Sequence, residues 1–252
     1  MDLSAGEKLE GVALVSGGGR RIGAAVARAL HAAGMNVAVH YRASGAEARQ
    51  LAGELNRVRP ASARALKADL RSLAQVERLA GQAAALWGRL DALVNNASSY
   101  FPTPFGSITE DAFDELVASN FKAPLFLAQA CVPRFGAHGA IVNVLDTLAR
   151  HPRPAFAPYA GAKAALWSLT ETLAVELAPR VRVNAVAPGH ILWPEAAALS
   201  SKQKGRELAG VPLGRLGTPE EIARGVCFLL SPASAYLTGV ILPVDGGLRL
   251  RG

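Results

Sequence analysis

The sequence predicts an α/β fold in which short buried strands alternate with helices. Half of the 252 residues are hydrophobic and 19% are charged, a composition that can form a sizeable core. Short apolar runs alternate with helical stretches, a pattern typical of strands joined by crossover helices. The first such unit has a glycine-rich turn between its strand and its helix. The sequence shows no internal repeat or composition break, so we expect one domain over residues 1–252.

The composition also narrows the classes of function. No apolar run reaches the roughly 18 residues that span a bilayer, and the first residues lack the layout of a secretion signal. Cys131 and Cys227 are too few for a disulfide framework, and no His/Cys cluster has metal-ligand spacing. We therefore expect a cytoplasmic protein with no membrane segment and no bound metal. The net charge of +7 indicates an anionic partner, but the 27 Lys and Arg are scattered, which favours a phosphate-bearing cofactor over nucleic acid.

The first strand, turn and helix predict a dinucleotide site. Residues 12–15 are an apolar run, residues 16–23 are glycine-rich, and a helix with small residues is expected from Ala24 onward. Glycines let backbone N–H groups approach a pyrophosphate, and the start of the helix adds a favourable dipole. The alternative is an ordinary strand-to-helix turn.

The end of the second strand, expected over residues 36–40, indicates the cofactor. An NAD enzyme usually has a carboxylate there for the ribose 2′-hydroxyl, whereas NADP requires cations and hydroxyls for the 2′-phosphate. No carboxylate occurs between Asn36 and Gly45, and Tyr41, Arg42 and Ser44 follow the strand. With Arg20 as a second charge nearby, the sequence predicts NADPH. The alternative is that Arg42 is a solvated loop residue.

The remaining elements follow the same alternation. Further strands are expected over residues 64–68, 90–94, 140–145, 181–186 and 240–244, and helices over 47–58 and 72–86, with Asp69 as a candidate N-cap of the latter. Thr218 and Glu221 form a predicted capping box, with Pro at the first helical position, that opens a helix ending at Leu230. Residues 193–210 include a polar, glycine-interrupted stretch, which we interpret as a flexible lid over a substrate.

Tyr159 and Lys163 are the candidate proton-transfer pair. They lie four residues apart at the start of a strong helical pattern, so both side chains project from one face. A nearby ammonium favours the phenolate, which predicts a lowered pKa for Tyr159 and proton exchange near neutral pH. The alternative is a solvated helix edge.

Asp146 and three aromatic residues add to this candidate site. Asp146 ends the fifth strand, thirteen residues before Tyr159, and either serves the reaction or caps the turn that follows. Tyr100 or Phe101 can stack on a flat ring, or both belong to the core or an interface. Trp193 either walls a flat-ligand pocket or anchors the lid by packing.

These motifs resemble the short-chain dehydrogenase/reductase family, and the resemblance covers essentially the whole chain. They are S-G-G-G-R-R-I-G at 16–23, N-N-A-S at 95–98, Y-A-G-A-K at 159–163 and P-G at 188–189. The resemblance implies a Rossmann fold with a doubly wound, seven-stranded parallel sheet, usually in a homotetramer. It places the site at the carboxyl ends of the strands and gives Asn120 a part in the proton path. The expected cofactor-binding residues are Gly17, Arg20, Arg21, Ile22, Gly23, Tyr41, Arg42, Ser44, Asp69, Leu70, Asn96, Ala97, Ser98, Tyr159, Lys163, Pro188 and Gly189.

Four departures from the common pattern of that family resemble the pteridine reductases. Arg21 replaces the middle glycine of the turn, Arg42 and Ser44 follow the second strand, a proline-bounded loop holds Tyr100, and Asp146 replaces a serine. A carboxylate suits an NH-rich heterocycle better than a ketone oxygen, because both the carboxylate and the ketone are acceptors. The resemblance implies NADPH-dependent reduction of a dihydropterin. The expected catalytic residues are Asp146, Tyr159, Lys163 and Asn120, and the expected substrate-binding residues are Arg21, Ser98, Tyr100, Asp146, Tyr159 and Trp193.

Two other functions fit parts of the sequence. A carbonyl reductase of 3-oxoacyl, steroid or sugar substrates would keep Tyr159 and Lys163 but would have no use for Asp146. A non-catalytic NADP(H) sensor would bind a partner through residues 196–210, but the intact Tyr159, Lys163 and Asn120 argue against it.

Overall fold

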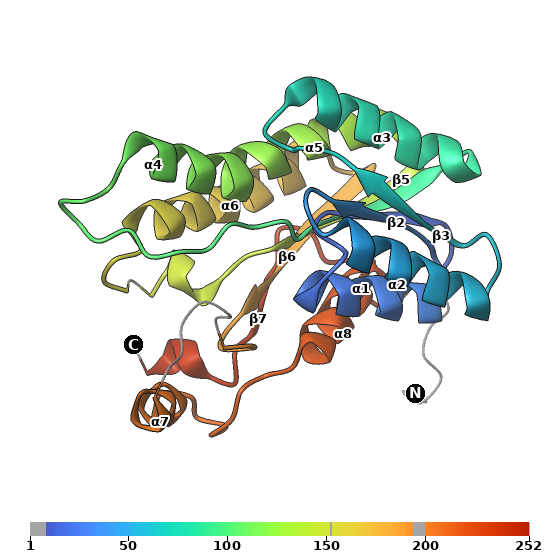
Figure 1. Cartoon of the computed structure of the whole chain (residues 1–252). Helices are drawn as coiled ribbons and strands as arrows, with labels where there is room; N and C mark the ends of the chain where they lie inside the picture. The colour runs from blue at the N-terminus through green and yellow to red at the C-terminus, as the bar shows by residue number, and fades with distance from the viewer. Residues whose placement is uncertain (1–8, 152, 194–199, 252) are drawn as a thin grey trace.

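The computed structural model describes residues 9–151, 153–193 and 200–251, and these form one parallel sheet between two layers of helices (Figure 1). The sheet has seven strands in the order β3-β2-β1-β4-β5-β6-β7, which confirms the doubly wound arrangement. All neighbouring strands pair in parallel. The strands are β1 Val12–Val15, β2 Asn36–Tyr41, β3 Ala63–Lys67, β4 Leu90–Asn95, β5 Phe135–Val144, β6 Val181–Pro188 and β7 Ile241–Val244.

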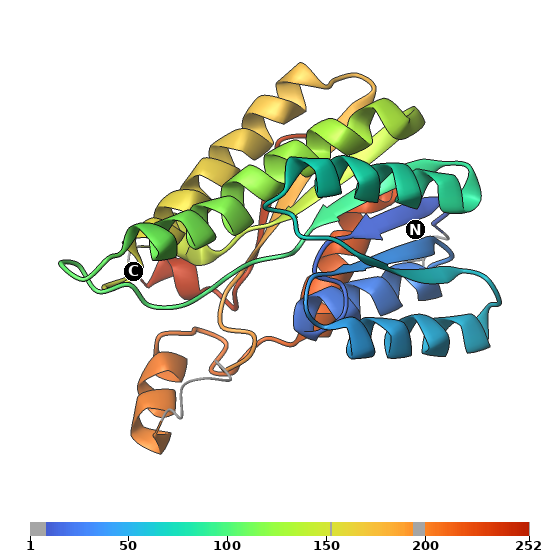
Figure 2. The same ribbon diagram turned by 45° about the horizontal axis from the view of Figure 1, so that its top comes forward.

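The helices cover both faces of the sheet (Figures 1 and 2). One face carries α1 (Arg21–Ala32), α2 (Gly45–Val58) and α8 (Pro219–Leu230). The other carries α3 (Leu73–Trp87), α4 (Glu110–Val117), α5 (Ala123–Cys131) and α6 (Ala157–Glu176). α7 (Ser201–Ala209) lies outside both layers, and Arg251 near the chain end donates to the carbonyl of Ala209 at 3.1 Å.

The period of the strands explains why two cores form. Successive side chains of a strand point to opposite faces, so Ala13 and Val15 pack under α1 and α8 whereas Val12 and Leu14 pack under α3 and α5. All four residues of β1 are buried, as expected for a strand covered on both faces. The sequence of such a strand is therefore a nearly continuous apolar run rather than an alternation of apolar and polar residues.

Several predicted boundaries are corrected by hydrogen bonds that only the folded chain provides. α1 begins at Arg21 rather than Ala24, because the N–H of Ala24 already donates to the carbonyl of Arg20. The fifth strand begins at Phe135 rather than Ala140, because Phe135 pairs with Leu90 of β4. β6 continues to Pro188 because β7 pairs with it. Shifts of one or two residues occur at the ends of β2, β3, β4, β7, α2 and α3.

The predicted helix starts had mixed outcomes. Asp69 is not the N-cap of α3, since Ser72 occupies that position and the Asp69 carboxylate instead accepts from the N–H and guanidinium of Arg71. The capping box of Thr218 and Glu221 is confirmed, as is the end of that helix at Leu230. Part of the predicted lid is the helix α7, which a second capping box opens; residues 194–199 lie outside the described part of the chain.

Among the described residues, no helix combines the length and the apolar character that crossing a membrane requires.

Candidate active site

The glycine turn after β1 brings backbone close to backbone. Gly17 has φ +60°, and a Cβ on it would lie 2.9 Å from the Cα of Ala97. A Cβ on Gly23 would lie 2.2 Å from the carbonyl oxygen of Gly17, so neither position accepts a side chain. Arg21 occupies the third tight position with φ +52°, a conformation that costs a non-glycine residue about 1–2 kcal/mol. Ile22 follows in the first turn of α1. The turn thus keeps its open shape although an arginine replaces a glycine.

Ser16 and Asn96 tie this turn to the end of β4. The Ser16 hydroxyl accepts from the backbone N–H groups of Asn96 (2.9 Å) and Ala97 (3.0 Å). The Asn96 side chain donates to the carbonyls of Ser16 (3.0 Å) and Gly17 (3.1 Å). The carboxyl ends of β1 and β4 are therefore fixed to each other at the point where the cofactor is expected.

His40 is a supporting residue for which the sequence predicted no role of its own. Its ring is buried, Nδ1 lies 3.1 Å from the backbone N of Gly17, and Nε2 lies 3.0 Å from the carbonyl oxygen of Ala68. Only a neutral ring with its proton on Nε2 satisfies both contacts. Burial lowers the pKa of His40, which agrees with that tautomer. In the sequence, the available signal was a histidine directly before Tyr41. In the structure, its side chain connects the glycine turn after β1 with β2 and with the end of β3.

The predicted NADPH contacts after β2 are Arg42 and Ser44, and the first of these has an acidic partner in the structure. Arg42 forms an ion pair with Glu115 of α4 at 3.1 Å, a contact that the sequence did not indicate. Ser44 stands at the N-cap position of α2, and a Cβ on Gly19 would lie 3.0 Å from its hydroxyl. Arg20 lies 3.9 Å from a carboxylate of α2. Cations and a hydroxyl thus gather beside the glycine turn.

Three further residues that were expected to bind the cofactor lie next to Arg42 in the sheet: Tyr41, Asp69 and Leu70. The Tyr41 hydroxyl accepts from Arg49 at 3.3 Å. Asp69 follows β3, and its hydrogen bonds with Arg71 lower the pKa of its carboxyl to about 2. Leu70 is buried beside it. These positions lie at the carboxyl ends of β2 and β3, as expected.

Asp146 and Tyr159 form the central contact of the site. The Tyr159 hydroxyl donates to Asp146 Oδ2 at 2.8 Å, while Oδ1 accepts from the backbone N–H of Leu148 at 2.8 Å. Asp146 therefore caps the turn, as one of the two interpretations expected, and its other oxygen faces the tyrosine. Tyr159 is only 4% exposed.

The expected phenolate is corrected by this geometry. Burial, together with the charge of Asp146 and its hydrogen bond, raises the pKa of Tyr159 well above its usual range. The Lys163 ammonium does not outweigh this effect, because it donates to the carbonyl of Val144 at 2.8 Å and lies 5.9 Å from the centre of the tyrosine ring. Tyr159 is a protonated donor in this structure, and the carboxylate rather than the lysine is its partner.

The pKa of Lys163 is also shifted by its surroundings. Its side chain is buried, and burial lowers the pKa of Lys163 to about 8 although the charge of Asp146 opposes the shift. A lysine whose charge changes so near neutral pH is typical of functional sites.

Asn120 links the helical layer to the loop after β4. It lies in a π-helical turn, Ala118–Lys122, which separates α4 from α5. Its side-chain nitrogen donates to the carbonyls of Ser99 (2.9 Å) and Leu116 (3.0 Å), and its oxygen accepts from the Ser98 hydroxyl at 2.7 Å. π-helical turns are frequent at functional sites because they redirect a side chain.

Tyr100 and Phe101 have different surroundings. Tyr100 stacks on Phe156 with a centroid separation of 4.9 Å and a 15° angle, meets Tyr159 edge-on at 4.9 Å, and remains 41% exposed. Phe101 packs in the cluster around Leu116. Tyr100 is therefore the residue that presents a partly exposed aromatic ring next to Tyr159, whereas Phe101 packs in the core.

The end of β6 lies at the same carboxyl end of the sheet. Pro188 ends that strand, and the N–H of Gly189 donates to the carbonyl of Val244 at 3.1 Å. The ring centre of Trp193 lies 5.8 Å from the Lys204 ammonium, so Trp193 contacts α7. It is not in contact with the tyrosine cluster through any interaction of the described residues.

α7 is held over this region by one carboxylate. Glu207 contacts Arg153 at 2.8 Å and His190 at 3.1 Å. Arg153 precedes α6, and His190 follows β6. Glu207 therefore joins the predicted lid to the two segments that flank the candidate site.

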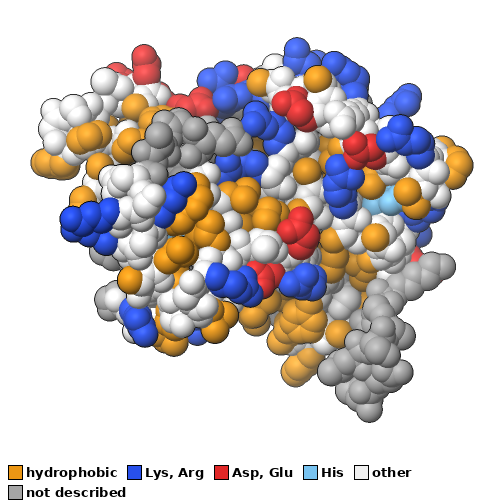
Figure 3. All heavy atoms as spheres, turned by 60° about the horizontal axis from the view of Figure 1, so that its bottom comes forward, with side chains coloured by type: hydrophobic (Ala, Val, Ile, Leu, Met, Phe, Trp, Pro, Cys, Tyr) orange, Lys and Arg blue, Asp and Glu red, His pale blue; other side chains and the backbone are white. Residues whose placement is uncertain are grey.

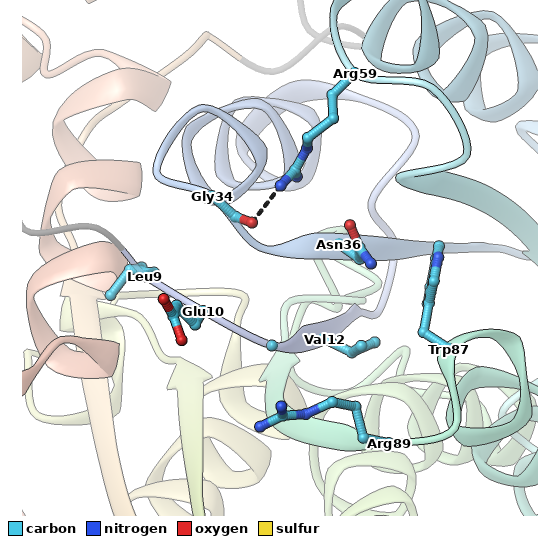
Figure 4. Close-up of a pocket in the computed structure, with 9 residues that line it drawn as sticks. Leu9, Glu10, Val12, Gly34, Asn36, Arg59, Trp87 and Arg89 are labelled. Carbon is cyan, nitrogen blue, oxygen red and sulfur yellow. Dashed lines mark hydrogen bonds between the residues drawn. The ribbon is translucent and has the colours of Figure 1, made fainter.

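Other surfaces offer less chemistry. Lys and Arg side chains are interspersed with acidic and apolar ones on the face drawn in Figure 3. A hollow of about 470 Å³ lies at the amino ends of β1 and β2, between Glu10, Asn36 and Trp87 (Figure 4). Arg59 reaches across it to the carbonyl of Gly34. This hollow is at the opposite edge of the sheet from Asp146, and among the described residues no group of His, Cys, Asp and Glu has a metal-binding arrangement.

The comparison with protein families agrees with this geometry. A family model described as "Enoyl-(Acyl carrier protein) reductase" matches residues 17–249, which include the glycine turn, Tyr159 and Lys163. This chain belongs to the short-chain dehydrogenase/reductase family. Its members are oxidoreductases that use nicotinamide cofactors, so the chain is an oxidoreductase.

Relatives within the short-chain dehydrogenase/reductase family carry different names. Pteridine reductase 1 of Leishmania tarentolae is 38% identical over 95% of this chain and 96% of its own length. An uncharacterized oxidoreductase of Mycobacterium tuberculosis is 38% identical over 94% of this chain and 91% of its own length. A 3-oxoacyl-[acyl-carrier-protein] reductase of Staphylococcus aureus is 33% identical over 96% of this chain and 100% of its own length. These relatives establish the family, but their names give different substrates, so the substrate has to be inferred from the residues of the site.

Proposed function

We propose that this short-chain reductase uses NADPH to reduce a dihydropterin or biopterin-like ring to its tetrahydro form. The observation that carries the proposal is the carboxylate of Asp146 at 2.8 Å from the hydroxyl of Tyr159, beside the partly exposed ring of Tyr100. A carboxylate at this position accepts hydrogen bonds from the N–H groups of a pterin, whereas it repels a ketone oxygen. The similarity to pteridine reductase 1 supports the same choice.

The cofactor fits the backbone and the charges of this chain. The absence of a Cβ at Gly17 and Gly23 lets the backbone of the turn pack closely on itself and on Ala97. This compact turn lies at the start of α1, where backbone N–H groups and the helix dipole would favour a pyrophosphate. Arg42 and Ser44 would hold the 2′-phosphate, and Lys163 the ribose next to the nicotinamide. NADPH, when bound, supplies the hydride that reaches the ring carbon.

The protein's own residues would handle the proton. Tyr159 is protonated, so it can donate to the ring nitrogen next to the reduced carbon. Asp146 orients the tyrosine and stabilises its protonated form, and the Lys163 ammonium stabilises the charge that tyrosine gains on donating. Asn120 fixes the loop that carries Tyr100, and the Tyr100 ring would stack on the pterin. Arg21, Ser98 and Trp193 are the further substrate contacts that we propose.

We further propose a cytoplasmic homotetramer that consists of one domain over residues 1–252. Sedimentation velocity of the purified protein tests the assembly, and a single species of four chains is the expected result.

The substrate is tested by following NADPH absorbance with dihydrobiopterin, beside an acetoacetyl thioester and with NADH as cofactor control. Oxidation of NADPH with the pterin and not with the thioester is expected. The similarity to a 3-oxoacyl reductase makes the opposite result informative, since oxidation with the thioester alone would assign Asp146 a structural role.

A further inference from the structure

Glu115 of α4 places its carboxylate between two arginines. Its Oε1 lies 3.1 Å from Arg42 Nη1, and its Oε2 lies 3.0 Å from Arg71 Nη1. The Ser99 hydroxyl donates to Oε1 at 2.6 Å. Arg71 also holds Asp69 through Nη2 at 2.6 Å. The five side chains form one connected network.

The network lies where the 2′-phosphate of the cofactor is proposed to bind. Arg42 directly follows β2, Asp69 and Arg71 follow β3, and Ser99 follows β4. β2 and β3 are neighbours in the sheet, so these groups meet at its carboxyl edge. Glu115 reaches the same edge from the helical layer.

The charges of the network cancel. Two guanidiniums face two carboxylates, so Arg42 has its charge matched by Glu115 rather than presented to solvent alone. Although burial opposes ionisation of Glu115, the Ser99 hydroxyl and the two arginines outweigh it and lower the pKa of its carboxyl. Glu115 is therefore ionised when the 2′-phosphate of the cofactor would bind.

If Arg42 exchanges Glu115 for a phosphate, no charged side chain of the network is left without a partner. When Arg42 turns to an incoming phosphate, Glu115 keeps Arg71 and the Ser99 hydroxyl as partners. The Arg42 side chain is 49% exposed, so its pair with Glu115 is of the partly solvated kind that opens at modest cost.

We propose that Glu115 is a specificity-determining residue, which competes with the 2′-phosphate of NADPH for Arg42 and thereby limits the preference for NADPH over NADH. This inference rests on the proposed cofactor. It predicts that neutralising Glu115 strengthens NADPH binding and leaves NADH binding nearly unchanged, since NADH has no group that needs Arg42.

The test measures dissociation constants of NADPH and NADH by titration calorimetry, without substrate, for the wild type and Glu115→Gln. The ratio of the two constants should shift toward NADPH by about 1.4-fold to fivefold, the range of a partly exposed ion pair. Glu110→Gln is the matched control, because it removes the same charge from an exposed position of α4, and its ratio should stay at the wild-type value. Glu115→Asp retains the carboxylate and should shift the ratio less than Glu115→Gln.

The outcomes separate this inference from the proposed function. A wild type that does not prefer NADPH would contradict the proposed cofactor itself. A wild type that prefers NADPH, with a ratio unchanged or lowered in Glu115→Gln, would overturn the inference alone, because Glu115 would then only support Arg42. A shift of equal size in Glu110→Gln would also overturn it, since the effect would come from net charge.

Discussion

Replacing Asp146 by Asn tests the carboxylate that distinguishes this site. Asn keeps the size of the side chain and an acceptor for the N–H of Leu148, but it removes the charge that faces Tyr159 at 2.8 Å. In the proposed complex this charge also accepts hydrogen bonds from pterin N–H groups, and a hydrogen bond to a charged group contributes about 1.5–3 kcal/mol. Since about 1.4 kcal/mol corresponds to a factor of ten in rate, kcat/KM for dihydrobiopterin should fall about 10-fold to 100-fold.

The assay is the initial rate of NADPH oxidation over a range of pterin concentrations and pH values. The dissociation constant of NADPH and the unfolding temperature should stay close to those of the wild type, which separates catalysis from folding. Asp114→Asn, at an exposed position of α4, is the matched control and should retain full activity. An Asp146→Asn enzyme with wild-type kcat/KM would refute the role of this carboxylate, as would a loss explained by weaker NADPH binding.

Three further predictions follow from the site. Because burial lowers the pKa of Lys163 to about 8, its ammonium is lost as the pH rises through that value; kcat/KM should fall above pH 8, and Lys163→Arg should move this fall upward. His40 is kept neutral in the folded protein, whereas the unfolded side chain titrates at about 6.5. The unfolded chain therefore binds more protons below that pH, so stability to urea should fall from pH 7.5 to 5.5, and less in His40→Gln. Glu207→Gln should raise KM for the pterin by about threefold to tenfold and speed hydrogen exchange over residues 201–209, because it loosens the contacts of α7 with Arg153.

Each of these predictions has a contradicting result. An alkaline fall at the same pH in Lys163→Arg would assign it to another group. An equal acid-side loss of stability in wild type and His40→Gln would exclude His40 as its source, since His31, whose pKa burial also lowers, is present in both proteins. A Glu207→Gln enzyme with unchanged KM and hydrogen exchange would show that its ion pairs do not hold the lid.

The sequence was sufficient where local pattern and chain order carry the information. The strand, glycine turn and helix at the start of the chain could be placed because close backbone approach at Gly17 and Gly23 requires glycine. The capping box at Thr218 could be placed because both of its hydrogen bonds are local.

The rest depends on contacts between distant segments, which no local pattern contains. The ion pair of Arg42 with Glu115 joins residues 73 positions apart, and the hydrogen bond of His40 with Gly17 crosses from β2 to the turn after β1. The pKa of Tyr159 was expected to be lowered by Lys163, since spacing alone gives their shared helix face. The fold instead directs the lysine to Val144 and the tyrosine to Asp146, which reverses the sign.

The most direct test of the central claim is competition between the two substrate classes in one vessel. Dihydrobiopterin and an acetoacetyl thioester are mixed at equal concentration with limiting NADPH, and both products are quantified. Nearly all of the NADPH should appear as tetrahydrobiopterin, in a one-to-one ratio. Reduced thioester as the main product, with the pterin unchanged, would contradict the account and make this protein a carbonyl reductase.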